Sequence, residues 1–422
     1  MAACQLGSRS IETIRMDNRP APDADHTLSN DQATFAERSD PDVSRAGASA
    51  RLSAPRSSKR DRRIDVLRGF ALLTIFIDHL SGNFLGTLTL RNFAFCDAAE
   101  LFVLLAGLSS MMAYGGTFER EGAGRGLRRV GARCVRIYLF QIGLLLATLA
   151  ILQRWLTHFG MEPHGIAPML RGGVRGLKHG LVLHALPSNL NILPLYIVLL
   201  AFFPIIYLGM RRSPGLTLLG SAAVWLATNL DPDLNLPNWM DGQGWFFNPF
   251  AWQFLFAIGV AAAYWQRHGR TLPRNRWAVW ACAAYVGFAL LATAPWANWG
   301  LDWRPIDIAT PDKTALAPLR LINVLTLVYL LMTAPAFDRL ARGRWFGFMA
   351  LCGRHSLEVF ATGTLLSLLG RLLFRTFGTG WELQLLVNGV GFALMIAVAQ
   401  MMERPRTRIA PARLRPSGAS HG

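Results

Sequence analysis

Ten apolar segments follow one another along this chain, each close to the length that crosses a lipid bilayer as an α-helix. They lie near residues 64–83, 98–116, 135–153, 190–209, 214–230, 249–265, 277–296, 317–337, 347–369 and 383–402. Charged residues make up only 16% of the 422 residues, which is less than a soluble protein of this size carries. We therefore expect an all-α fold, a polytopic transmembrane bundle of about ten helices.

Basic residues between these segments predict how the bundle is oriented. The formal net charge is +17, and the arginines form short runs before the first segment, in alternate loops and after the last segment. The loop 231–248 contains no Lys or Arg. Cytoplasmic loops of membrane proteins are enriched in Lys and Arg, so we expect both termini in the cytoplasm. The same distribution argues against nucleic acid as a partner.

Composition divides the chain into three regions. Residues 1–60 lack an apolar run and are rich in Asp, Arg, Ser, Ala and Pro, so we expect a disordered cytoplasmic tail. Residues 61–403 form the expected membrane domain, and residues 404–422 form a basic cytoplasmic C-terminal tail. The five cysteines have no metal-ligand spacing, and the nucleotide-binding and metalloprotease motifs are absent from the sequence. We expect no metal and no bound cofactor.

Charged residues inside the first apolar segment point to chemistry within the bundle. A charge at the centre of a membrane helix costs about 2.5–3.5 kcal/mol, so it rarely persists there without a role. Arg68 and His79 fall on the same helix face, about 16 Å apart along the axis. Asp65 is one turn before Arg68 and can pair with it. His79 is the candidate general base; alternatively, it ties helices together.

Two acids open the second apolar segment at the expected membrane level of His79. Asp97 and Glu100 either cap the helix N-terminus or orient the imidazole and stabilise its protonated form. Glu100 lies further into the apolar run, which favours the orienting role for it. Asp78 projects about 100° away from His79 on the helix. We therefore expect Asp78 to contact another helix or a substrate.

Polar and aromatic residues gather where the fourth, sixth and eighth segments begin, on the same outer side. Amides and aromatic rings suit sugars, and cations suit an anionic group. The candidate substrate-binding residues are Asn191, Asn248, Trp252, Gln253, Lys313 and Arg320. For Trp252 an aromatic belt at the membrane interface is the favoured alternative. For the two cations the alternative is a side chain that reaches out to the interface.

The ninth segment contains a further group of ionisable residues. Arg354 and Glu358 have i, i+4 spacing, which predicts a pair on one helix face, either structural or functional. His355 is a second candidate base.

Six ordered blocks of the sequence carry a resemblance to a known family. They are RxIDVLRGFALLTIFIDH, TLRNFAFCDAAELFVLLAG, NLNILPLYIVLL, NPFAWQFLFAIG, DKTALAPLRL and CGRHSLEVFATGTLLS. Over about residues 60–403 the chain resembles the OpgC family, membrane succinyltransferases that decorate osmoregulated periplasmic glucans of Gram-negative bacteria. That family is similar to the wider acyltransferase-3 group of ten-helix membrane acyltransferases. The group has a basic residue, ten intervening residues and a His in its first helix, which Arg68 and His79 match. Cys96 and Ala106 stand where the family more often has Ser, so neither position needs a hydroxyl.

The resemblance implies an enzyme of the bacterial inner membrane. It would move an acyl group, succinyl in the named members, from acyl-CoA to hydroxyls of a periplasmic glucan. His79 would be the base, oriented by Glu100 or Asp97, with Arg68 toward the CoA side. The candidates for holding a succinyl carboxylate are Lys313, Arg320 and Arg354. The implied partners are acyl-CoA, the glucan or a related polysaccharide, and the bilayer. The alternatives are an acyltransferase for another envelope polysaccharide, and a transporter or flippase without acyl-transfer chemistry.

Overall fold

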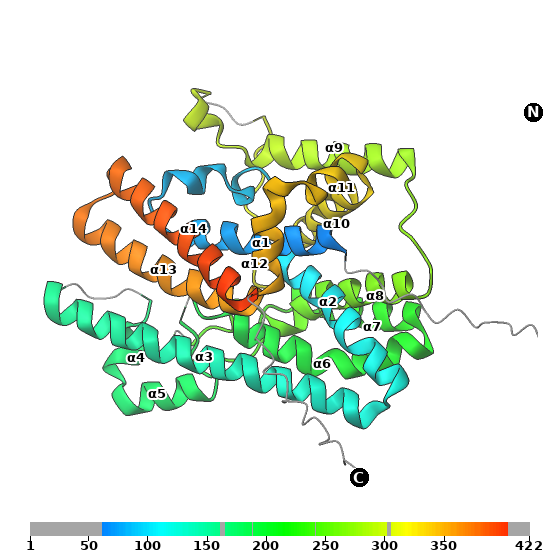
Figure 1. Ribbon diagram of the computed structural model, residues 1–422, viewed down its shortest axis with the longest axis horizontal. Helices are drawn as coiled ribbons and strands as arrows, with labels where there is room; N and C mark the ends of the chain where they lie inside the picture. The colour runs from blue at the N-terminus through cyan, green and yellow to red at the C-terminus, as the bar shows by residue number, and fades with distance from the viewer. Residues whose placement is uncertain (1–60, 161–164, 188, 241, 302–304, 404–422) are drawn as a thin grey trace, which may run out of the picture. The chain divides into compact units, whose positions relative to one another are not determined.

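The computed structural model describes residues 61–160, 165–187, 189–240, 242–301 and 305–403, and the regular elements in these ranges are helices. The α-helices in Figure 1 are α1 (Arg62–Asp78), α2 (Ala98–Arg120), α3 (Ala123–Phe159), α4 (Ala167–Arg171), α5 (Gly173–Leu181), α6 (Ile192–Arg212), α7 (Pro214–Leu230), α8 (Pro249–Arg267), α9 (Arg276–Thr293), α10 (Pro318–Thr333), α11 (Pro335–Arg342), α12 (Gly347–Arg354), α13 (Ser356–Phe377) and α14 (Trp381–Glu403). Short 3-10 helices lie in the connections: η1 (Phe84–Leu88), η2 (Leu90–Asn92), η3 (Trp296–Trp299) and η4 (Arg344–Phe346). The all-α prediction is confirmed, and each of the ten apolar segments coincides with one helix or with two successive helices. The predicted tails, residues 1–60 and 404–422, lie outside the described residues.

Six of the described helices are long and apolar enough to cross a membrane, namely α2, α3, α6, α9, α13 and α14. Helices α10 and α11 pass the same test together, but they are bent by 74° and would form one broken span. Helix α1 has 17 residues and carries the charged residues discussed above. The predicted count of about ten spans and the cytoplasmic location of both termini stay predictions.

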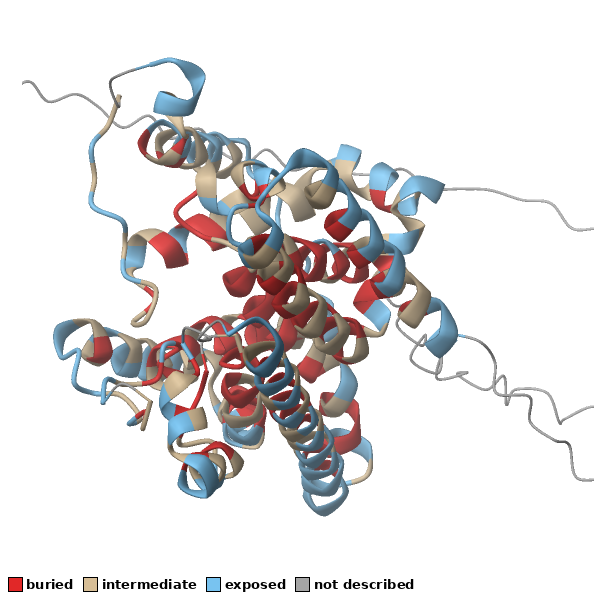
Figure 2. Ribbon diagram, turned by 90° about the vertical axis from the view of Figure 1, so that its left-hand side faces the viewer, coloured by how far each residue is buried: buried red, intermediate tan, exposed pale blue. Residues whose placement is uncertain are grey.

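The outer helices expose apolar side chains, as a lipid environment requires. Leu216 and Leu219 of α7, Trp277 of α9 and Leu385 of α14 are each more than 60% exposed. Figure 2 shows buried residues concentrated inside the bundle and exposed ones along the outer helix surfaces. Such an arrangement is typical of a membrane bundle, because lipid tails cover apolar surface as well as protein does.

Glycines allow the central helices to approach closely. A Cβ atom on Gly107 of α2 would overlap a backbone carbonyl of α8, and one on Gly259 of α8 would overlap a backbone carbonyl of α2. The same reciprocal arrangement joins α1 to α12 through Gly69 and Gly353. Small residues at helix crossings are how membrane helices pack when no hydrophobic effect drives their association. These two crossings fix α1 and α2, which carry the candidate chemistry.

The ninth apolar segment is two helices rather than one, which corrects a predicted pair. The backbone leaves the helical conformation at His355, so Arg354 and Glu358 no longer share a helix face. Arg354 instead pairs with Glu403 at the end of α14, with 2.9 Å between Nη2 and Oε1. Glu358 accepts a hydrogen bond of 2.5 Å from Nη2 of Arg136 on α3. Glu403 therefore joins α14 to α12, and Glu358 joins α13 to α3.

Candidate active site

A cavity of about 220 Å³ lies where the end of α1 meets the starts of α2 and α6 and one side of α13. Its polar lining consists of Asp78, His79, Arg91, Asp97, Asn189, Asn191, Lys313, Thr364 and Ser367. Aromatic side chains, among them Phe246 and Phe247, form part of its apolar wall. The cavity thus gathers five residues that the sequence had singled out: Asp78, His79, Asp97, Asn191 and Lys313. Among the described residues, no three His, Cys, Asp or Glu side chains are grouped as ligands for a metal ion.

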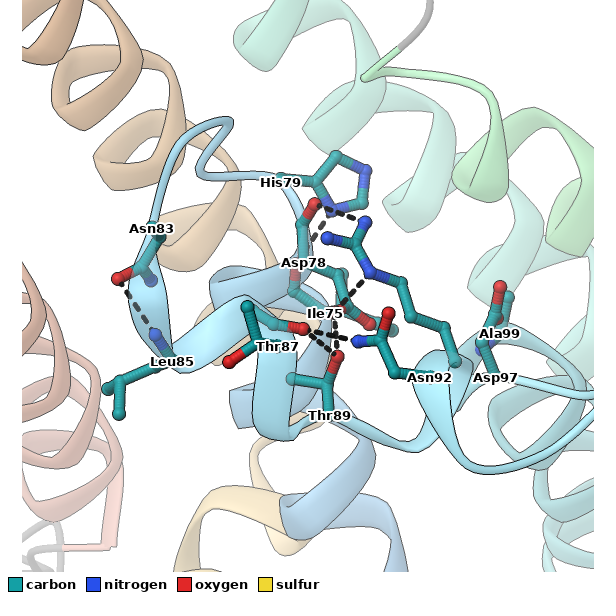
Figure 3. A network of polar contacts seen from close by, with 12 residues as sticks. Ile75, Asp78, His79, Asn83, Leu85, Thr87, Thr89, Asn92, Asp97 and Ala99 are labelled. Carbon is teal, nitrogen blue, oxygen red and sulfur yellow. Dashed lines mark hydrogen bonds and ion pairs between the residues drawn. The ribbon is translucent and has the colours of Figure 1, made fainter. Parts of the chain in front are cut away.

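His79 stands immediately after the last residue of α1, and its ring is held by its own helix. The Nδ1 atom lies 2.6 Å from the backbone carbonyl of Ile75, one turn earlier (Figure 3). A carbonyl oxygen can only accept, so Nδ1 carries the proton and Nε2 of the neutral ring keeps a lone pair. The structure therefore favours the tautomer that a general base requires, because His79 lines the cavity and its Nε2 has no hydrogen-bond partner in the described part of the chain.

The predicted orienting role of Asp97 and Glu100 is corrected by this geometry. The ring's hydrogen-bond partner is the Ile75 carbonyl, not a carboxylate. The two acids instead form a capping box at the start of α2. Asp97 accepts a hydrogen bond of 2.8 Å from the N–H of Ala99, and Glu100 accepts one of 2.9 Å from the N–H of Asp97. The local role of both residues is therefore to cap the N-terminus of α2.

The remaining oxygens of the capping box bind the two cations at the beginning of the eighth segment, one just before it and one inside it. Nζ of Lys313 pairs with Oδ2 of Asp97. Nε of Arg320 donates to Oε1 of Glu100 at 2.6 Å, and its Nη2 lies 3.3 Å from Oδ2 of Asp97. Glu100 and Arg320 are buried behind the cavity wall, so Arg320 does not reach out to the interface. The cluster balances two negative charges with two positive ones and holds Lys313 at the cavity.

Asp78 holds the loop between α1 and α2. Its Oδ1 accepts a hydrogen bond of 2.6 Å from the hydroxyl of Thr89 and lies 3.5 Å from Nε of Arg91 (Figure 3). Arg91 also lines the cavity. Asp78 therefore contacts another segment of the chain, which was one of its two predicted roles, and helps to position Arg91 at the cavity.

Trp252 is buried inside the bundle, so the favoured prediction of an interfacial belt is wrong. Its indole Nε1 donates to the backbone carbonyls of Lys313 and Thr314 at 3.1 and 3.2 Å. The ring therefore anchors the loop that brings Lys313 to the cavity. Trp252 is not one of the residues that line the cavity, so it supports the site instead of facing a substrate there.

Two amides predicted to bind substrate also have structural partners instead. Asn248 caps α8 by accepting from the N–H of Phe250 at 3.0 Å and donates to the carbonyl of Leu234 at 2.7 Å. Gln253 joins α8 to α7 through the hydroxyl and carbonyl of Ser221, at 2.5 and 2.8 Å. Neither amide lines the cavity.

Residues predicted near the cytoplasmic end of the first helix form a separate group. Nη2 of Arg68 donates to the hydroxyl of Ser356 at 2.6 Å, and Asp65 is buried on the same helix. Nε2 of His355 lies 2.7 Å from Oε2 of Glu403, so His355 is engaged at the end of α14. None of these residues lines the cavity, and the donor-side role expected of Arg68 and the second-base role expected of His355 stay predictions.

Sequence reasoning missed four polar residues of the cavity, namely Arg91, Asn189, Thr364 and Ser367. Arg91 had a signal, because it is the only basic residue of the loop 84–96. Thr364 and Ser367 are three apart in an otherwise apolar segment, which places them on one helix face. Hydroxyl side chains are common in membrane helices, so this spacing alone is only a weak indication that the two residues line a cavity.

The model of one protein family, described as OpgC protein, matches residues 60–407. The match covers both the cavity and the capping-box cluster. Comparison with curated proteins returned no match.

Proposed function

The chain belongs to the OpgC family, and from this premise we propose that it transfers a succinyl group from succinyl-CoA to hydroxyls of a periplasmic glucan. The family and the apolar helices make it an acyltransferase-like membrane protein. The succinyl donor, the glucan, the inner membrane and the role of His79 are our proposal. One observation carries it: the Nδ1–Ile75 bond leaves Nε2 of a cavity-lining histidine ready to accept a proton.

The proposed reaction uses this lone pair directly. Nε2 of His79 removes the proton of a sugar hydroxyl while the sugar oxygen attacks the thioester carbonyl carbon. The carbon–sulfur bond then breaks, and the CoA sulfur leaves with the proton from the imidazolium. The products are a sugar ester and free CoA. The Ile75 carbonyl keeps the ring in one orientation and stabilises the imidazolium during the transfer, as an acid does in a triad.

Lys313 supplies positive charge to the same cavity. A tetrahedral intermediate carries negative charge on the former carbonyl oxygen, and a fixed cation lowers its free energy. Asp97 holds the Lys313 ammonium in place, and the rings of Phe246 and Phe247 lie 5.9 and 5.5 Å from it. We assign Lys313 to this oxyanion and not to the succinyl carboxylate.

The donor would approach from the other end of α1, where Arg68 lies. The guanidinium of Arg68 is suited to the phosphates of CoA, because arginine binds phosphate with two parallel hydrogen bonds. Ser356 holds one of its nitrogens, which positions the side chain between α1 and α13. This donor-side role rests on the residue type and on the predicted topology.

The test is the substitution His79→Asn. The asparagine amide can still donate to the Ile75 carbonyl, but it cannot accept the proton of a hydroxyl as a base. We expect acyl transfer by purified protein in nanodiscs, followed as esterified glucan and released CoA, to fall by at least about 100-fold.

His268 provides the matched control. It follows α8 as His79 follows α1, and its Nδ1 lies 2.7 Å from the carbonyl of Tyr264, but it is outside the cavity. His268→Asn should retain transfer. A folded His79→Asn protein that also retains transfer would remove the base from the proposal. Movement of glucan without consumption of succinyl-CoA by the unmodified protein would favour a transporter.

A further inference from the structure

A second cavity of about 320 Å³ lies beside the first, between α3, α13 and the loops that follow α1 and α5. Its lining includes Ser81, two residues beyond His79, and two arginines of α13, Arg371 and Arg375. Asn189 lines both cavities, so they are neighbours with one side chain in common. Arg371 is also close enough to His79 to interact electrostatically with its ring.

Arg371 and Arg375 are one helical turn apart and face the same cavity. Neither guanidinium forms an ion pair or a hydrogen bond with the part of the chain that the structure describes. Arg375 lies in the last turn of α13, where the helix dipole favours a cation. That effect fades within one turn, so it does not explain Arg371, which is half-buried and one turn further in.

The cations that the sequence suggested for a succinyl carboxylate are already neutralised. Lys313 is paired with Asp97, Arg320 with Glu100, and Arg354 with Glu403. A carboxylate added to the Arg320 or Arg354 pair would meet an existing carboxylate, and Lys313 is already assigned to the oxyanion. The surplus positive charge near His79 is instead located in the second cavity.

We propose that the second cavity is the subsite for the free carboxylate of a dicarboxylic acyl group, held by Arg371 and Arg375. The guanidinium of arginine binds a carboxylate with two parallel hydrogen bonds, and the charge of both ions strengthens these bonds. The thioester end of the same acyl group lies in the first cavity at His79, and the short carbon chain passes Asn189. This subsite rests on the proposed function, because it places one end of the donor that the function requires.

The experiment compares two donors that differ in this carboxylate, succinyl-CoA and acetyl-CoA. In Arg371→Gln the ratio of kcat/KM for succinyl-CoA to that for acetyl-CoA should fall by about 10- to 100-fold, because a charged hydrogen-bonding group is lost. Turnover of acetyl-CoA should change less than turnover of succinyl-CoA, because the substitution alters both reactions through the charge near His79 but removes a carboxylate partner only for succinyl-CoA. Arg154→Gln is the control, because Arg154 is an exposed arginine of α3 that lines neither cavity. An equal fall for both donors in Arg371→Gln would overturn the subsite and leave the transferase proposal intact.

A binding measurement separates the subsite from the transferase activity. Free succinate should raise the Tm of the purified protein more than acetate does, and Arg371→Gln should abolish the difference. Succinate-specific stabilisation without any acyl transfer would support the anion subsite and contradict the proposed function. Phospholipid is the other source of an anion at this membrane level. Loss of co-purified phospholipid from Arg371→Gln, with an unchanged donor ratio, would assign the arginines to a lipid phosphate and overturn the proposal.

Discussion

Single buried side chains connect the cavity to the rest of the bundle, and Trp252 is the clearest case. Replacing it with Phe removes the N–H that satisfies two backbone carbonyls of the Lys313 loop. Buried acceptors left without a donor cost about 1–3 kcal/mol, so we expect Trp252→Phe to lower the free energy of unfolding in mixed micelles by that amount. Trp277→Phe is the control, because Trp277 is 70% exposed. Equal effects of the two substitutions would contradict the anchoring role of the Trp252 N–H.

Some residues of the site could be predicted from the sequence, and others could not. His79, Asp97, Asn191 and Lys313 were predictable, because the charges of the loops predict that these ends of several segments lie on one side of the membrane. Some polar residues line the cavity, and others hold its walls in place. The difference between them depends on tertiary partners that lie far away in sequence. The hydrogen bonds of the Gln253 amide to Ser221, on the preceding helix, left no periodic signal.

At the scale of helices, the Gly107–Gly259 crossing joins α2 to α8. A methyl group on Gly107 would overlap a carbonyl of α8, whereas a methyl group on Gly143 of α3 would meet nothing within 4 Å. Gly107→Ala should destabilise the protein by about 1–3 kcal/mol through overpacking. Gly143→Ala should be neutral or stabilise it by up to about 1 kcal/mol, because alanine favours the helix. The prediction is therefore that Gly107→Ala alone lowers the free energy of unfolding, measured in mixed micelles, and a comparable destabilisation by Gly143→Ala would contradict it.

Helices themselves were predictable to a large extent, because apolar runs of this length have few other structures open to them. The break at His355 was not. The residues on both sides form one apolar segment without proline, so periodicity continues through the break. The close approach of Gly353 to α1 and the ion pair of Arg354 with Glu403 belong to tertiary packing, which the local pattern does not encode.

For the whole molecule, the side of the membrane on which the cavity opens decides which acceptor it can meet. Phe246 and Phe247 of the cavity wall belong to the loop 231–248, which contains no Lys or Arg and is therefore predicted to be periplasmic. Helix α6 ends with Arg211 and Arg212 just before its connection to α7, and this end is predicted to be cytoplasmic. A glucan in the periplasm reaches His79 only if this orientation holds.

Cysteine labelling in spheroplasts tests this orientation directly. In a background whose five native cysteines are replaced, Asp233→Cys should react with a membrane-impermeant maleimide. Arg212→Cys should react only after the membrane is opened. Both residues are exposed, so the side of the membrane and not burial controls the reaction. The reverse pattern would place the cavity on the cytoplasmic side. The periplasmic glucan would then be excluded as acceptor, while the acyl-transfer chemistry of His79 would still stand.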